Sequence, residues 1–141
     1  SKTEGYNPQR MNSLNHYAYG AIGEWMYERI AGIAPLEPGY KMIEIAPQLG
    51  PQLTSASASL NTPYGKVVSS WKVDGTYFSL ETTIPPNTTA RIIIPGNIAE
   101  EILLDGAIMV NNPNMELVAK KDSAFELKAQ PGNYTLKTIL Q

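Results

Sequence analysis

The spacing of apolar residues changes once along this chain, at the segment APLEPGYK (residues 34–41), and this change limits the fold more than any other feature. Before the segment, apolar residues recur every three or four positions from Asn12 to Ile33, which predicts one amphipathic helix. Asn12 or Ser13 can cap its first turn, and Gly32 is a suitable stop at its C-terminal end. The two prolines of the segment prevent the helix from continuing.

After this segment, apolar and polar residues alternate, which is the period of a half-buried β-strand. The alternation predicts strands at residues 41–47, 53–62, 66–73, 77–84, 85–95, 101–104, 107–110, 115–119, 124–128 and 133–140. Turn sequences separate them, among them TPYG at 62–65, two Asp-Gly pairs at 74–75 and 105–106, and PGN at 131–133. Many short strands with regular turns predict a mainly β fold, an antiparallel β-sandwich of jelly-roll or Greek-key type.

The predicted helix is apolar around most of its circumference, because Tyr19, Trp25 and Tyr27 point in different directions at helical spacing. It also contains Gly20 and Gly23, each of which costs roughly 1 kcal/mol relative to alanine. Glycines are tolerated in a helix where another backbone or a ligand comes close. The helix is therefore expected either to cap the sandwich or to be the edge of an upstream helical domain, and its composition favours the second.

The charge distribution excludes several classes of partner. The net charge is −2 and the basic residues are scattered, so the electrostatic footprint of a nucleic-acid-binding protein is missing. The longest apolar runs are far shorter than the roughly 20 residues that a membrane-spanning helix needs, so no membrane association is expected. The chain has no cysteine, which excludes disulfides and thiolate metal sites.

His16 is the only histidine and lies in the first turn of the predicted helix. Asn12, Asn15 and Tyr17 lie close to it in the sequence, and amide, imidazole and phenol groups together suit a hydroxyl-rich ligand. A purely structural histidine is the alternative. The sequence contains no nucleophile elbow, calcium loop or phosphate-binding glycine pattern, so it predicts no catalytic residue, cofactor or metal site.

Other chemistry-bearing residues have structural explanations. Glu24 and Glu28 are expected on a solvated helix face, and the pair Glu100-Glu101 is expected to be exposed at the start of a strand. Trp71 and Tyr77 flank the Asp-Gly turn at 74–75, where they could stack on a sugar, but cross-strand packing is the more common role of such a pair.

Four segments of the chain, taken together and in this order, resemble the C-terminal part of bacterial α-L-rhamnosidases. They are MNSLNHYAYGAIGEWMYERIAGI (11–33), PGYKMIEIAPQLG (38–50), SASLNTPYGKVVSSW (57–71) and IPPNTTARIIIP (84–95). These enzymes are large inverting glycoside hydrolases with an (α/α)6 barrel. The resemblance is strong from Met11 to Pro95 and loose beyond it.

The resemblance implies that residues 1–34 hold the last helix of the catalytic barrel, at Ser13 to Ala31, and that residues 35–141 form the C-terminal β-sandwich. It also implies that His16 binds the rhamnose in the −1 subsite. The general acid of the family lies far upstream, and its general base precedes the histidine by more residues than this chain holds; Glu4 is too close to match. Since an inverting glycosidase needs two carboxyl groups about 6.5–9.5 Å apart, the chain alone is expected to be an inactive fragment.

The expected partners are L-rhamnose-containing glycans or glycosides and the upstream barrel. Two alternatives remain open at this stage. The sandwich could be a stand-alone carbohydrate-binding module, or it could be a structural domain that self-associates through the exposed faces of the helix. The sequence leaves the compartment open, with the resemblance favouring a periplasmic or secreted protein.

Overall fold

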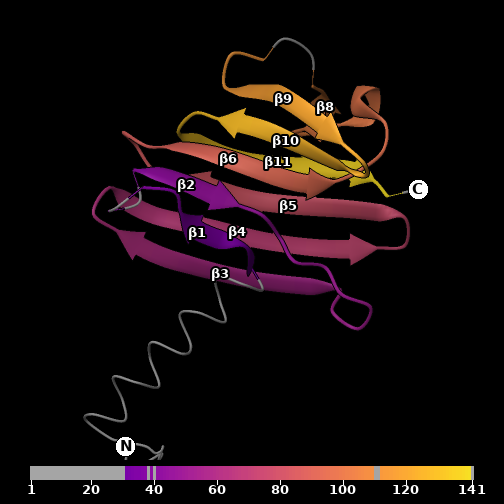
Figure 1. Cartoon of the computed structure of the whole chain (residues 1–141), viewed down its shortest axis with the longest axis horizontal. Coiled ribbons are helices and arrows are strands. Elements are labelled where there is room, and N and C mark those ends of the chain that lie inside the picture. Colours follow the sequence, from indigo (N-terminus) through magenta and orange to yellow (C-terminus); the bar gives the residue numbers. More distant parts are fainter. Residues whose placement is uncertain (1–30, 38, 40, 110–111, 141) are drawn as a thin grey trace, which may run out of the picture.

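The computed structural model describes residues 31–37, 39, 41–109 and 112–140, and these form a two-layered β-structure (Figure 1). The strands are β1 (Ile33–Pro35), β2 (Met42–Ile45), β3 (Ser55–Thr62), β4 (Gly65–Asp74), β5 (Tyr77–Ile84), β6 (Thr89–Pro95), β7 (Leu103–Leu104), β8 (Ala107–Ile108), β9 (Met115–Lys121), β10 (Ala124–Ala129) and β11 (Gly132–Ile139). A short 3₁₀ turn, η2 (Ala99–Glu101), precedes β7. The predicted helix lies outside the described residues apart from its last residue, Ala31, which is helical.

The strands form two sheets that face each other. The first has the order β1-β2-β6-β10-β9 and the second the order β3-β4-β5-β11-β7-β8. Neighbouring strands are antiparallel except for β2 and β6, which run parallel. The predicted β-sandwich is therefore confirmed, and each of the ten predicted strand segments overlaps one of β2 to β11.

β1 differs from the sequence-based expectation. The helical spacing of apolar residues extended to Ile33, but Ile33 starts β1 and pairs with Ile45 of β2. Both side chains are fully buried in the sandwich core. An apolar residue at position 33 fits the helical spacing and also the first core position of the sheet, and the structure places it in the sheet. The division of the chain at residues 34 and 35 stays a prediction.

The core lies between the two sheets and is formed by the inward-facing residues of each strand. On β4 and β5 these are alternate residues, and Trp71 stacks on Phe78 with 6.3 Å between ring centroids and 27° between ring planes. The largest fully buried side chains are Trp71, Phe78, Phe125, Ile33, Ile43, Ile45, Leu80, Ile84, Ile92, Ile94, Ile102 and Met115. Each such side chain stabilises the fold by roughly 1.5–3 kcal/mol through removal of apolar area from water.

The buried polar side chains of the described part are all hydroxyls: Ser69, Thr82, Thr88 and Thr138. Each donates a hydrogen bond to a backbone carbonyl oxygen, at 2.6–2.7 Å. Two of these bonds connect the two sheets, Thr138 of β11 to Pro95 of β6 and Ser69 of β4 to Ala31, which precedes β1. A buried hydroxyl costs little when it is bonded in this way, so these residues fix the sheets relative to each other.

Tyr134 on β11 anchors the turn that precedes it. Its hydroxyl donates to the carbonyl oxygen of Gln130 at 2.7 Å and also lies 3.2 Å from that of Pro131. Burial raises the pKa of the Tyr134 phenol above its ordinary value, and the nearby Asp105 carboxylate raises it further. The phenol is therefore a neutral donor at physiological pH. No helix of the described part is long and apolar enough to cross a membrane.

Candidate functional site

The sequence-predicted binding residue His16 lies outside the described residues, as do Asn12, Asn15, Tyr17, Glu4, Glu24 and Glu28. Their roles stay predictions. Two features of the described part bear on function: the point at which the chain enters the sandwich, and a hollow at one end of it.

The chain enters the sandwich at Ala31 and Gly32, and three contacts fix it there. The Ser69 hydroxyl of β4 donates to the Ala31 carbonyl oxygen at 2.6 Å, and both residues are buried. The Ala46 N–H donates to the Gly32 carbonyl oxygen at 2.7 Å, which extends the β1–β2 ladder by one residue. Ile33 then enters the core. We call Ala31, Gly32, Ala46 and Ser69 the joint.

Glycine is the only residue type that fits at position 32 of the joint. Its φ of +86° lies in the left-handed region, which is unfavourable for residues with a Cβ. A Cβ at this position would also overlap the backbone carbonyl group of Ala46. Gly32 was expected from the sequence to end a helix, and Ala31 is the last helical residue. The close approach to Ala46 gives this glycine a second role that only the fold reveals.

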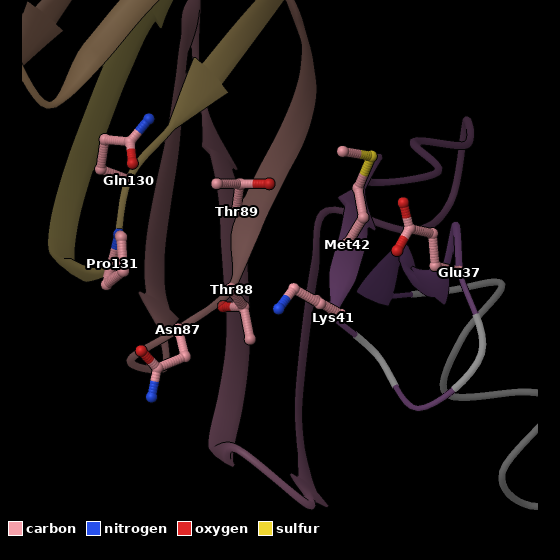
Figure 2. Close-up of a pocket in the computed structure, with 8 residues that line it drawn as sticks. All are labelled: Glu37, Lys41, Met42, Asn87, Thr88, Thr89, Gln130 and Pro131. Atoms are coloured by element: carbon pink, nitrogen blue, oxygen red, sulfur yellow. The ribbon is translucent and has the colours of Figure 1, made fainter.

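The hollow lies between three connections of the sandwich and has a volume of about 350 Å³ (Figure 2). The lining comes from the β1–β2 connection, the β5–β6 turn, the β10–β11 turn and the first residues of β2 and β6. It consists of Glu37, Lys41, Met42, Asn87, Thr88, Thr89, Gln130 and Pro131. Figure 2 shows the Lys41 side chain extending toward the side of the hollow formed by Thr88. The Lys41 ammonium also lies over the Tyr64 ring, 5.9 Å from its centroid.

The chemistry of the hollow suits binding and not hydrolysis. Its carboxylate, ammonium, amide and hydroxyl groups can donate and accept hydrogen bonds to a polyol, and Met42 supplies an apolar surface. Glu37 is the one carboxylate in the lining, whereas an inverting glycosidase needs a pair. Within the residues that the structure describes, no group of three His, Asp or Glu side chains could hold a metal ion.

Among the described residues, the three aromatic candidates for sugar stacking lie in different places. Trp71 is buried in the core against Phe78, which confirms the packing interpretation for this residue. Tyr77 is 46% exposed, and the Lys137 ammonium lies 4.5 Å from its ring centroid. Tyr64 lies in the β3–β4 turn, at the other end of β4 from Tyr77. Trp71 is therefore in the core, and Tyr64 and Tyr77 lie at opposite ends of β4.

Two groups of charged residues, at η2 and around Arg91, have a structural explanation. Glu100 and Glu101 are exposed in η2, as expected from the sequence. Arg91 on β6 forms ion pairs with Glu126 at 3.3 Å and with Glu44 at 3.8 Å. These pairs cross three neighbouring strands on the outer face of the first sheet, so they support strand pairing and do not form an acid–base pair.

Ser69 of the joint was not among the residues to which the sequence pointed. A signal for it was present, because Ser69 shares the inward-facing alternation of β4 with Val67 and Trp71. A polar residue in a row of core positions indicates a buried hydrogen bond. Its acceptor is 38 residues away in the sequence, so the pattern by itself could not identify it.

Comparison with known protein families divides the chain at the joint. Residues 32–107 match the model of the bacterial α-L-rhamnosidase C-terminal domain. Residues 1–30 match the model of the bacterial α-L-rhamnosidase six-hairpin glycosidase domain. The boundary between the two matches falls at Ala31, where the Ser69 hydroxyl bonds to the backbone.

Similar proteins are much longer than this chain. It is 56% identical over 134 residues to an α-L-rhamnosidase of Formosa agariphila, which covers 95% of this chain and 14% of that protein. It is 44% identical over 98 residues to an α-L-rhamnosidase of Streptomyces avermitilis, covering 70% of this chain and 10% of that protein. The chain thus spans about one seventh or less of the length of the relatives it matches.

Solved structures show the same fold. The crystal structure of the Streptomyces avermitilis α-L-rhamnosidase complexed with L-rhamnose superposes with a TM-score of 0.73 at 35% identity, covering 90% of this chain and 12% of that one. The α-L-rhamnosidase from Aspergillus terreus superposes with a TM-score of 0.63 at 31% identity, covering 94% of this chain and 12% of that one.

Proposed function

Because the chain belongs to the bacterial α-L-rhamnosidase family, whose C-terminal domain it contains, we propose that it is the C-terminal part of an enzyme that hydrolyses terminal α-L-rhamnosyl residues with inversion. The observation that carries the proposal is the order of the two family matches, a glycosidase domain up to residue 30 and a C-terminal domain from residue 32. The substrates are L-rhamnose-containing glycans or glycosides. The sandwich has a structural role in this enzyme.

The chemistry of the described residues supports a division of roles between the sandwich and the upstream barrel. Among the described residues that line the hollow, Glu37 is the one carboxylate. The carboxylates of Glu44 and Glu126 lie on a sheet face, on either side of the Arg91 guanidinium. Neither arrangement can supply both an acid and a base across a glycosidic bond. In the proposed enzyme the upstream helical barrel supplies the catalytic carboxylates, and the 141-residue chain alone is inactive.

His16 is the substrate-binding residue of this chain in the proposed enzyme. In the proposed enzyme the His16 imidazole donates a hydrogen bond to a rhamnose hydroxyl or accepts one from it. The similarity to a Streptomyces avermitilis enzyme that was crystallised with L-rhamnose supports this assignment of the ligand.

The test compares this 141-residue chain with the same chain extended upstream through the whole helical barrel, each as wild type and as His16→Ala. The substrate is p-nitrophenyl α-L-rhamnopyranoside. We expect hydrolysis by the extended protein alone, and loss of most of that activity in its His16→Ala variant. An inert extended protein would contradict the proposed enzyme function.

A carbohydrate-binding module is the second candidate, and the hollow is the observation that favours it. Its polar lining and its volume of about 350 Å³ are compatible with a small sugar. Calorimetric titration of the 141-residue chain with L-rhamnose and with rhamnose-containing oligosaccharides distinguishes the two. The second candidate would replace the first if two results were obtained together. The 141-residue chain would have to bind the sugar and lose this binding in its Asn87→Ala variant, and the extended protein would have to be inert.

A further inference from the structure

The joint holds the backbone more firmly than a connection between two domains requires. A linker that only tethers domains is exposed and makes few contacts with either of them. Here Ala31, Gly32 and Ile33 are all buried, and two hydrogen bonds of 2.6 and 2.7 Å hold consecutive carbonyl groups. One donor, Ala46, directly follows β2 of the first sheet, and the other, Ser69, lies on β4 of the second. Both layers of the sandwich therefore hold the backbone at Ala31 and Gly32.

A small change in the direction of the backbone at the joint would displace His16 by a large distance if a helix connects them. His16 precedes Ala31 by 15 residues, so a helix between them would be about 22 Å long. A tilt of about 5° at the joint would then move the first turn of that helix by about 2 Å. Catalysis is sensitive to such displacements, since a misplacement of about 1 Å can lower a rate by about 100-fold.

We infer that Ser69 and Gly32 are positioning residues, through which the sandwich holds the predicted helix with His16 in the orientation needed to bind the sugar. This inference rests on the proposed function, and it gives the sandwich a specific role in that function. Gly32 allows the backbone to pass against Ala46, and the Ser69 hydroxyl fixes the carbonyl group at the end of the helix. Neither residue touches the substrate.

Ser69 is the better position for a test, because a substitution of Gly32 could prevent folding. Ser69→Ala removes the hydroxyl from the joint, and Ser69→Thr restores it. Thr138→Val is a matched control, since it removes a buried hydroxyl that also donates to a carbonyl of the opposite sheet, at 2.7 Å and away from the joint. Both Ser69→Ala and Thr138→Val should destabilise the sandwich to a similar extent.

The experiment measures kcat and KM of the chain extended through the barrel, on p-nitrophenyl α-L-rhamnopyranoside and at a temperature where every variant is folded. We expect Ser69→Ala to lower kcat/KM by about tenfold, and Ser69→Thr to restore most of it. Thr138→Val should change kcat/KM by less than about twofold, because it lowers stability without moving the helix. Equal losses in Ser69→Ala and Thr138→Val would overturn the inference, since a loss of stability would then explain both.

A double-mutant cycle tests whether Ser69 acts through His16. In the His16→Ala background, Ser69→Ala should change kcat/KM by less than about twofold, because the positioned group is already gone. The same tenfold loss in both backgrounds would overturn the inference and leave the proposed function intact. An inert wild-type enzyme would instead overturn the proposed function, and the inference with it.

Discussion

Gly32→Ala is the substitution whose cost can be worked out most directly from the structure. Two effects add at this position. A residue with a Cβ in the left-handed region costs roughly 1–2 kcal/mol. Overlap of that Cβ with the Ala46 carbonyl group forces a backbone shift, which typically costs about 1–3 kcal/mol. The free energy of unfolding of the 141-residue chain should therefore fall by about 2–5 kcal/mol.

Gly75→Ala separates the two effects. Gly75 also has a positive φ, of 64°, but nothing lies within 4 Å of where its Cβ would be. This control should therefore lose only the conformational part, roughly 1–2 kcal/mol. Urea unfolding followed by far-UV circular dichroism gives both values. With a typical dependence of the free energy of unfolding on urea concentration, the midpoint of the urea transition should fall by about 2 M for Gly32→Ala. It should fall by about half as much for Gly75→Ala. Equal shifts would refute the steric argument for the joint.

Three further predictions concern the sandwich. Trp71→Ala should lower the free energy of unfolding by about 3–5 kcal/mol, because it empties a buried site against Phe78. The control Tyr77→Ala should cost less than about 1 kcal/mol, because Tyr77 is exposed. Equal costs in urea unfolding would contradict the core assignment of Trp71. Since the pKa of Tyr134 is raised in the folded state, its contribution to stability should be fully present below the pKa of the unfolded phenol, about 10, and be lost as the pH rises through the folded value. Unfolding at pH 8 and at pH 11 should show this loss in the wild type and a smaller one in Tyr134→Phe, and the same pH dependence in both would count against the assignment. Arg91→Ala should cost less than about 1 kcal/mol for each of its two exposed ion pairs, with a smaller effect in 1 M salt; a salt-independent loss would point to packing of the arginine stem instead.

The local pattern of the sequence was enough to locate most of the strands. β5 was predicted with both of its ends, and the turns at residues 62–65 and 74–75 lie between the expected strands. These features depend on neighbouring residues only: alternation decides which side chains face inward, and Gly, Asp and Pro decide where the chain turns. The exposure of Glu100 and Glu101 and the burial of Trp71 were expected on the same basis.

Other features depend on which segments meet, and no local pattern specifies that. Ile33 fits a helical spacing as well as a strand, and its pairing with Ile45 decided in favour of β1. The parallel pairing of β2 with β6 joins strands more than 40 residues apart, although all other neighbouring strands of the described part are antiparallel. His16 stays a prediction from resemblance, because it lies outside the described residues.

The sequence by itself determined the β-sandwich and its turns, because these follow from residue types at short spacing, and four of its segments carried the family resemblance. Only the tertiary structure decided what Ser69 and Gly32 do. The Ser69 hydroxyl needs an acceptor once it is buried, and the fold supplies one from a segment 38 residues earlier. Gly32 could end a helix in any fold, but only the packing of β1 beside β2 brings the Ala46 backbone so close that no side chain fits.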